Sequence, residues 1–172
     1  NLHVTLAFLG DCEQSQLDSL DWHLEEIASS CPSVELKVDS LSLFPYGKRP
    51  KLLAAILSPG DALVELHHQV ERAAKDIGIY VEKRRFVPHI TLGRLRGHGR
   101  REMSLPSVSI GMSDIAPAMA LFESTLTQDG AIYDELFRYD LVPDVDDLLT
   151  DGVDLDDSES QFIGLNAAQG QK

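Results

Sequence analysis

The spacing of apolar residues along the first 142 positions predicts helices and strands in a regular order. Two stretches, 13–30 and 61–77, repeat apolar residues at the period of an amphipathic helix, and Gly78 follows the second as a stop signal. Trp22, within the first of these helices, is expected in the core. Strand-like patterns occupy residues 2–9, 34–44, 52–57, 89–95, 108–112, 120–126 and 136–141. This order predicts an α+β fold with largely antiparallel sheets.

The composition changes after Pro143. The stretch DVDDLLTDGVDLDDSES is acidic, poor in aromatic residues and without a sustained period. Such composition is typical of chains that do not fold on their own. We therefore expect one folded domain over residues 1–142 and an acidic, disordered tail over residues 143–172.

The charge distribution is compatible with a short anionic ligand, although the net charge is −13. The tail holds eight of the 28 acidic residues and only one basic residue. Ten of the other 14 basic residues fall into three short clusters: Lys48, Arg49 and Lys51; Lys83, Arg84 and Arg85; Arg94, Arg96, Arg100 and Arg101. Because local potential steers an anionic ligand, these clusters suit an RNA end. They fit poorly with tight nonspecific binding to long duplexes.

Cysteine usage and hydropathy bear on the environment of the protein. Cys12 and Cys31 form no disulfide framework and match no metal-ligand spacing, which predicts a reduced, cytoplasmic protein. No apolar run approaches the roughly 18–20 residues of a membrane-spanning helix, so we expect no membrane partner. We also expect a monomer.

One short motif occurs twice. Residues 3–8 read His-Val-Thr-Leu-Ala-Phe and residues 89–94 read His-Ile-Thr-Leu-Gly-Arg. Positions i and i+2 of a strand share a face, so each motif presents one histidine and one threonine on a polar face. A single histidine is usually structural, but a matched pair with threonine at the same offset favours a function.

This pair of polar faces suits phosphodiester chemistry. Opening a cyclic phosphate needs a base for the attacking water and an acid for the departing sugar oxygen, and histidine can fill both roles near neutral pH. Threonine hydroxyls can hold the nonbridging phosphate oxygens. The sequence shows no set of residues with metal-ligand spacing, so neither a metal nor another cofactor is expected.

Two further residues are candidates for substrate binding. Arg94 contacts phosphate or RNA only if a bulge at Gly93 turns it toward the face of Thr91, and the alternative is a solvated surface charge. Phe44 could stack on a nucleobase, and the alternative is a place in the core. Phe86 and Tyr133 have the same two alternatives. The histidines within the helices, His23, His67 and His68, are expected to be ordinary helix residues.

The two motifs and their surroundings resemble the family of 2′-5′ RNA ligase and RNA 2′,3′-cyclic phosphodiesterase, within the two-histidine phosphoesterases. The segments NLHVTLAFLG, LFPYGKRPKLL, EKRRFVPHITLGRLR and LFESTLTQDGAIY occur in the family's order. The resemblance implies two pseudo-symmetric lobes, each an antiparallel sheet backed by helices, with one motif on each wall of a cleft. It implies that His3 donates a proton to the leaving O3′ and that His89 activates water, which leaves a 2′-phosphate. Thr5 and Thr91 would bind the phosphate.

The sequence departs from the family pattern in three places. A strand and a helix that usually precede the first motif are missing. If the protein begins at Asn1, one lobe loses a strand, and the uncovered sheet edge would be a stability and aggregation liability. Ala54 stands where the family often has Trp, and Val87 stands where it often has Arg.

Three functions remain open. The first is hydrolysis of a terminal RNA 2′,3′-cyclic phosphate, with His3 and His89 as the catalytic residues. The second is formation or cleavage of 2′-5′ RNA linkages by the same histidines, with a sugar hydroxyl in place of water. The third is a noncatalytic module that binds RNA ends or small nucleotides.

Overall fold

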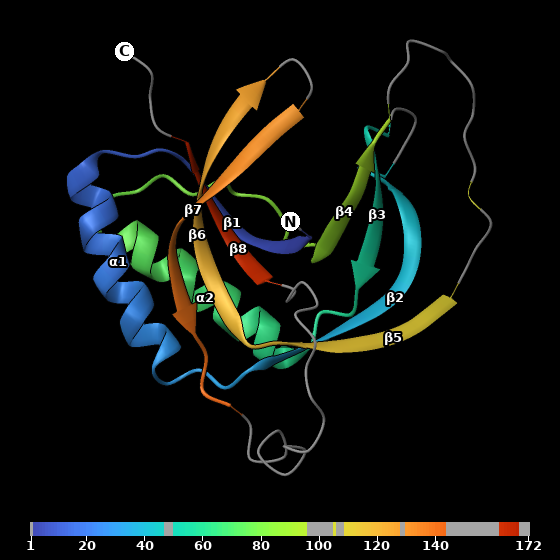
Figure 1. Ribbon diagram of the computed structural model, residues 1–172, viewed down its shortest axis with the longest axis horizontal. Helices are drawn as coiled ribbons and strands as arrows, with labels where there is room; N and C mark the ends of the chain where they lie inside the picture. The colour runs from blue at the N-terminus through green and yellow to red at the C-terminus, as the bar shows by residue number, and fades with distance from the viewer. Residues whose placement is uncertain are drawn as a thin grey trace.

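In the part of the chain that the structure describes, the fold consists of eight strands and two helices (Figure 1). The structure is a computed structural model that describes residues 2–46, 50–95, 105, 109–127, 130–143 and 162–168. Its elements are β1 (His3–Asp11), α1 (Gln14–Ala28), β2 (Val34–Phe44), β3 (Leu52–Leu57), α2 (Asp61–Asp76), β4 (His89–Arg94), β5 (Ser109–Ala116), β6 (Ala118–Thr127), β7 (Gly130–Asp140) and β8 (Phe162–Ala168). Each helix and strand predicted from periodicity is confirmed, and β8 is an addition.

The strands form one sheet in the order β5-β2-β3-β4-β1-β8-β6-β7. It consists of two groups of four strands, which meet where β1 pairs with β4 at Val4 and Ile90. Figure 1 shows β4, β3, β2 and β5 on one side and β1, β8, β6 and β7 on the other. Among the described strands, only β8 runs parallel to its neighbours, β1 and β6. The predicted α+β fold with largely antiparallel pairing is confirmed.

The two helices pack on each other and on the strands. α1 contacts β7, and α2 contacts β1 and β2. Leu17, Leu20 and Leu24 are buried at the spacing predicted for one face of α1. Trp22 lies on the other side of the same helix and is 63 % exposed, so its predicted burial is wrong. In the part of the chain that is described, neither helix combines the length and the apolar character needed to cross a membrane.

The segment 162–168 corrects the prediction of a disordered tail. It forms β8, which pairs with β1 from His3 to Asp11 and with β6 from Met119 to Glu123. The side chain of Ile163 is completely buried in the hydrophobic core. The rest of the predicted tail, residues 144–161 and 169–172, lies outside the described residues.

β8 also bears on the uncovered sheet edge that a missing strand would leave. β1 has a neighbour on each side, β4 and β8, so its backbone groups face partners in both directions. The strand β8 was not predicted because its apolar run is short. The acidic residues that precede this run dominate any average over the tail. Its partner β1 also lies more than a hundred residues earlier in the chain, and its partner β6 lies about 40 residues earlier.

Candidate active site

The two repeated motifs lie side by side where the two groups of strands meet. Val4 and Ile90 form an antiparallel pair, and both side chains are buried. Extending this register by one residue each way places His3 opposite Thr91, and Thr5 opposite His89. Alternation along the strands then directs these four polar side chains to the face opposite the core.

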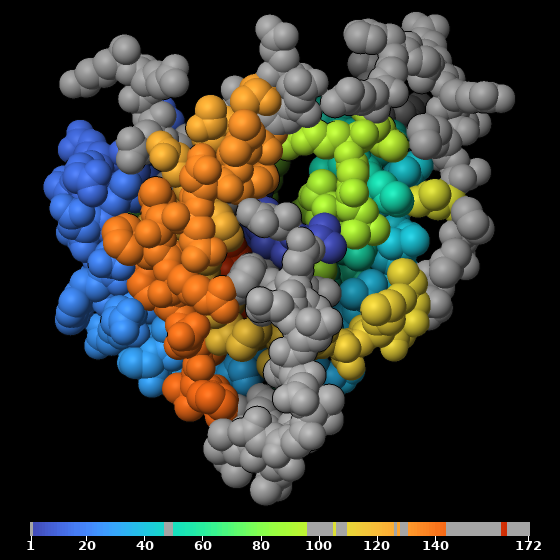
Figure 2. All heavy atoms as spheres, viewed as in Figure 1, coloured from blue at the N-terminus to red at the C-terminus, as the bar shows by residue number. Residues whose placement is uncertain are grey.

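The four residues open into a single cavity of about 460 Å³. The other two residues predicted for the site, Arg94 and Phe44, also line this cavity. Figure 2 shows the surface hollowed between β7, in orange, and the green segment that includes β4. The structure therefore brings all six predicted site residues together, from β1, β2 and β4.

The imidazole of His89 has a defined tautomer when it is neutral. Its Nδ1 lies 2.7 Å from the carbonyl oxygen of Val87. Because a carbonyl oxygen only accepts hydrogen bonds, Nδ1 carries the hydrogen, and Nε2 is left with the lone pair. The ring of Phe44 stacks on His89 with the centroids 4.4 Å apart. Phe44 thus supports His89, and its role as a platform for a nucleobase stays a prediction.

Two aromatic rings contact His3. The ring of Tyr133, from β7, meets the imidazole edge-on at a centroid distance of 5.0 Å. The ring of Phe122, from β6, lies 5.6 Å away at an angle of 31°. These contacts restrict the orientation of His3, and Tyr133 itself lines the cavity.

Arg94 reaches the cavity through an irregularity in β4. Leu53 and Ala54 of β3 pair with Gly93 and Thr91, which leaves Leu92 as an extra residue in β4. Such a bulge reverses the alternation of the residues that follow it. Arg94 therefore shares the cavity face with Thr91, although it follows by three positions. The bulge on which this orientation depends lies at Leu92, one residue before Gly93.

The cavity wall is more basic than the protein as a whole. Among its described residues, Lys51, Arg84, Arg85 and Arg94 are basic, and Glu71 and Glu82 are acidic. The carboxylate of Glu82 pairs with Arg84 at 2.6 Å. A wall of this charge favours an anionic ligand inside an acidic protein. The basic residues at 48, 49, 96, 100 and 101 lie outside the described part of the chain.

Comparison with known proteins identifies the family. A model described as the 2′-5′ RNA ligase superfamily matches residues 1–107. The chain belongs to the 2′-5′ RNA ligase superfamily. It is 31 % identical to the RNA 2′,3′-cyclic phosphodiesterase of Bacillus subtilis, over 81 % of this chain and 76 % of that protein. The protein of the same name from Aquifex aeolicus is 33 % identical, over 77 % and 74 % of the two chains.

Solved structures share the fold of this chain. E. coli LigT in complex with 3′-AMP superposes with a TM-score of 0.66 at 26 % identity. The match covers 82 % of this chain and 77 % of LigT. A Thermus thermophilus protein superposes with a TM-score of 0.73 at 22 % identity, over 83 % and 79 % of the chains. This second match shows the shared fold.

His67 lines the cavity, although it was expected to be an ordinary helix residue. Its side chain is only 7 % exposed and lines the cavity from α2. Its Nδ1 lies 2.8 Å from the carbonyl oxygen of Leu6, and its ring stacks on Phe86 at a centroid distance of 4.0 Å. Leu6 is the extra residue of a bulge in β1, because Thr5 and Ala7 pair with consecutive residues of β8. His67 therefore anchors the bulge that follows Thr5. Its position among the buried apolar residues of α2 could have indicated that it faces inward.

We expect the His67→Leu variant to lower the free energy of unfolding by about 1–3 kcal/mol at pH 7.5, because the Leu6 carbonyl would lose its donor. Burial lowers the pKa of His67 below its ordinary value. As the pH falls below about 6.5, the His67 imidazole is therefore protonated in the unfolded chain before it is protonated in the folded protein. The free energy of unfolding then decreases, because the contribution of neutral His67 is lost. Urea unfolding at pH 7.5 and 5.5 should show a smaller pH effect in the variant. His68→Leu, at an exposed neighbouring position, is the control; equal pH effects in wild type and His67→Leu would contradict the assignment.

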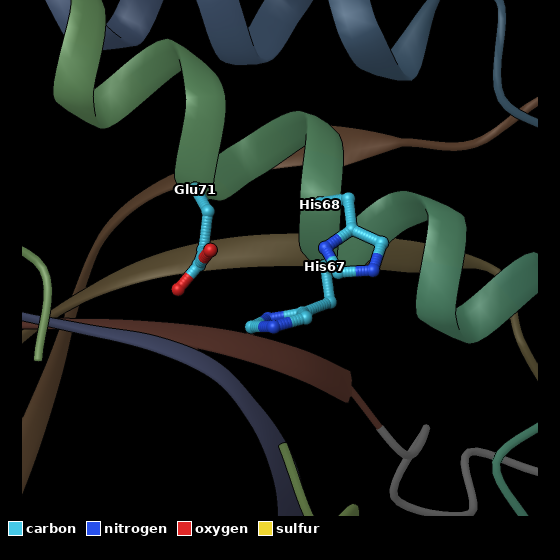
Figure 3. Close-up of side chains that lie close together, drawn as sticks. All are labelled: His67, His68 and Glu71. Carbon is cyan, nitrogen blue, oxygen red and sulfur yellow. The ribbon is translucent and has the colours of Figure 1, made fainter. Parts of the chain in front are cut away.

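His67 also belongs to a cluster that resembles a metal-binding set (Figure 3). One ligand atom from each of His67, His68 and Glu71 lies within 4.8 Å of the others. The Glu71 carboxylate binds the Lys75 ammonium at 2.7 Å, and a positive charge there opposes a cation. The Nδ1 of His67 is also engaged by the carbonyl oxygen of Leu6. These contacts favour a structural role for the cluster.

Proposed function

We propose that this protein hydrolyses a terminal 2′,3′-cyclic phosphate of RNA, or of a small nucleotide, to a 2′-phosphate without a metal ion. The observation that carries the proposal is the placement of both histidine–threonine pairs around one basic cavity. The names of the Bacillus subtilis and Aquifex aeolicus relatives support the same reaction. The 3′-AMP complex of E. coli LigT supports a nucleotide as the ligand class.

In the proposed mechanism His89 is the general base. Its Nδ1–H is held by the Val87 carbonyl, so the lone pair of Nε2 is available to take a proton from water. The water oxygen then forms a bond to phosphorus as the bond from phosphorus to O3′ breaks. The proton that O3′ needs comes from His3, which begins the cycle as an imidazolium.

The remaining polar side chains stabilise the charge on the phosphate. The hydroxyls of Thr5 and Thr91 donate to the nonbridging oxygens, where negative charge is concentrated in the transition state. The guanidinium of Arg94 adds a positive charge at the same cavity. After the reaction His89 is protonated and His3 is neutral, and exchange with solvent restores both.

The proposal favours water over a sugar hydroxyl as the nucleophile. Ligation to a 2′-5′ linkage is the same displacement with a different attacking oxygen, so the two histidines serve both reactions. The relatives named above carry the name of the hydrolase, and we therefore place hydrolysis first.

Incubation with an oligonucleotide that ends in 2′,3′-cyclic phosphate, in the presence of EDTA, tests this proposal. We expect the oligonucleotide to gain the mass of one water and to carry its phosphate on O2′. Chromatographic comparison of the product with authentic 2′-phosphate and 3′-phosphate standards identifies the position. An intact cyclic end after prolonged incubation, or a 3′-phosphate product, would contradict the proposal. A parallel reaction with 2′-5′-linked RNA halves measures ligation.

A further inference from the structure

Gly164 lies beneath the imidazole of His3. It belongs to β8, where it pairs with Thr5 on one side and with Ala120 on the other. Residues paired across neighbouring strands point to the same face, so the missing side chain of Gly164 would point toward the cavity face. A Cβ atom built there would lie 3.0 Å from Cδ2 of His3 and 3.0 Å from Cε2 of Phe122.

This open space permits a contact across the strand. His3 is on β1 and Phe122 is on β6, and β8 lies between these two strands. Adjacent strands are about 4.8 Å apart, so the two backbones are separated by roughly twice that distance. The rings nevertheless approach to a centroid distance of 5.6 Å, over the position of Gly164. Tyr133 contacts both rings and completes the cluster.

The backbone conformation of Gly164 also indicates that the absence of a side chain, and not the flexibility of glycine, is important at this position. Its backbone is not among those with positive φ, so any residue can adopt it. Glycine is intrinsically unfavourable inside a strand, where β-branched residues are preferred. The backbone of β8 therefore does not require glycine, and the contact between His3 and Phe122 does.

We propose that Gly164 is a positioning residue for His3, and that β8 is thereby part of the active site. The inference rests on the proposed function for its catalytic consequence. Its structural content, that a side chain at position 164 displaces the His3 imidazole, stands independently of the reaction. The segment after the acidic stretch thus sets the geometry of a residue at the opposite end of the chain.

Substitution of Gly164 by alanine and by valine in the full chain tests the inference. We expect kcat to fall about 100-fold for Gly164→Val, the order of loss for a displacement near 1 Å, and less for Gly164→Ala, with KM changed little. Gly60→Ala is the matched control, because a Cβ at Gly60 meets no atom within 4 Å. It should retain the wild-type kcat.

Two readouts separate displacement of His3 from a general loss of structure. The first is the NMR signal of the His3 ring, assigned by its absence in a His3 variant; it should shift in both Gly164 variants and not in Gly60→Ala. The second is an analogue with sulfur in place of the bridging O3′. A thiolate leaves without a proton because the pKa of a thiol, about 8.5, is far below that of an alcohol. Displacement of His3 should therefore lower kcat much less on this analogue than on the cyclic phosphate with oxygen at that position.

The outcomes distinguish the inference from the proposed function. An inactive wild type rejects the proposed function, and the His3 signal then still decides the inference. An unchanged His3 signal and unchanged kcat in folded Gly164→Val overturn the inference while the function stands. If Gly164→Val does not fold, the same two measurements on Gly164→Ala decide.

Discussion

Replacing His89 with asparagine should lower kcat by about 10³-fold and leave the melting temperature within a few degrees of the wild type. The amide of asparagine can donate to the Val87 carbonyl as Nδ1 of His89 does, so the local backbone keeps its partner. The amide has no basic nitrogen in place of Nε2, so the attacking water loses its general base. General-base catalysis typically contributes 10²–10⁴-fold, and the expected loss lies within this range.

Single-turnover hydrolysis of the cyclic-phosphate oligonucleotide measures this loss directly. His23→Asn provides a matched control, because His23 lies on α1 beside Trp22 and is not among the residues that line the cavity. The control should retain wild-type activity. A His89→Asn variant that keeps more than a third of the wild-type kcat would exclude His89 as the base.

His3 and His89 are supported in the same way, which agrees with the pseudo-symmetry that the family resemblance implies. Phe44, on β2, reaches His89, on β4, across the intervening strand β3. Ala54 lies on β3 between them, and its side chain is completely buried. In the other half Gly164 occupies the corresponding place on β8, between Phe122 and His3. A small residue on each middle strand thus lets an aromatic ring support a histidine two strands away.

The parts of the fold that the sequence predicts correctly depend on local patterns. The buried face of α1 follows from its periodic leucines, and Gly78, with φ of +79°, follows α2 where a stop was predicted. β8 depends instead on partners far away in the chain, and no local pattern reports such pairing. The apolar run at 162–168 was a usable signal, because without β8 the strand β1 would have a neighbour on one side only.

The candidate site shows the same division. His3, Thr5, His89 and Thr91 share a face because strand alternation is fixed by backbone geometry, so their placement could be predicted. Arg94 faces the cavity only because β4 contains a bulge. The effect of such a bulge on the orientation of Arg94 could be predicted, but only the structure shows that the bulge is present. His67 and Gly164 act through contacts with β1 that arise only when distant segments pack together.

The role of His3 can be separated from that of His89 by the choice of leaving group. We expect His3→Asn to lower kcat about 10³-fold on the natural cyclic phosphate, because O3′ would leave without a proton. On the analogue with sulfur in place of O3′, the same variant should recover most of the activity, since a thiolate needs no proton. His89→Asn removes the base for water and should show the same loss on both substrates.

The comparison assigns the acid and the base without reference to any relative. If His89→Asn recovers on the sulfur analogue and His3→Asn does not, the two roles are exchanged. Equal losses for both variants on both substrates would exclude a dedicated acid, and the histidines would then act by stabilising the charged transition state. The proposed mechanism requires recovery in His3→Asn alone. By the same reasoning Gly164→Val should behave as a weaker form of His3→Asn, because its substitution disturbs the acid and leaves the base in place.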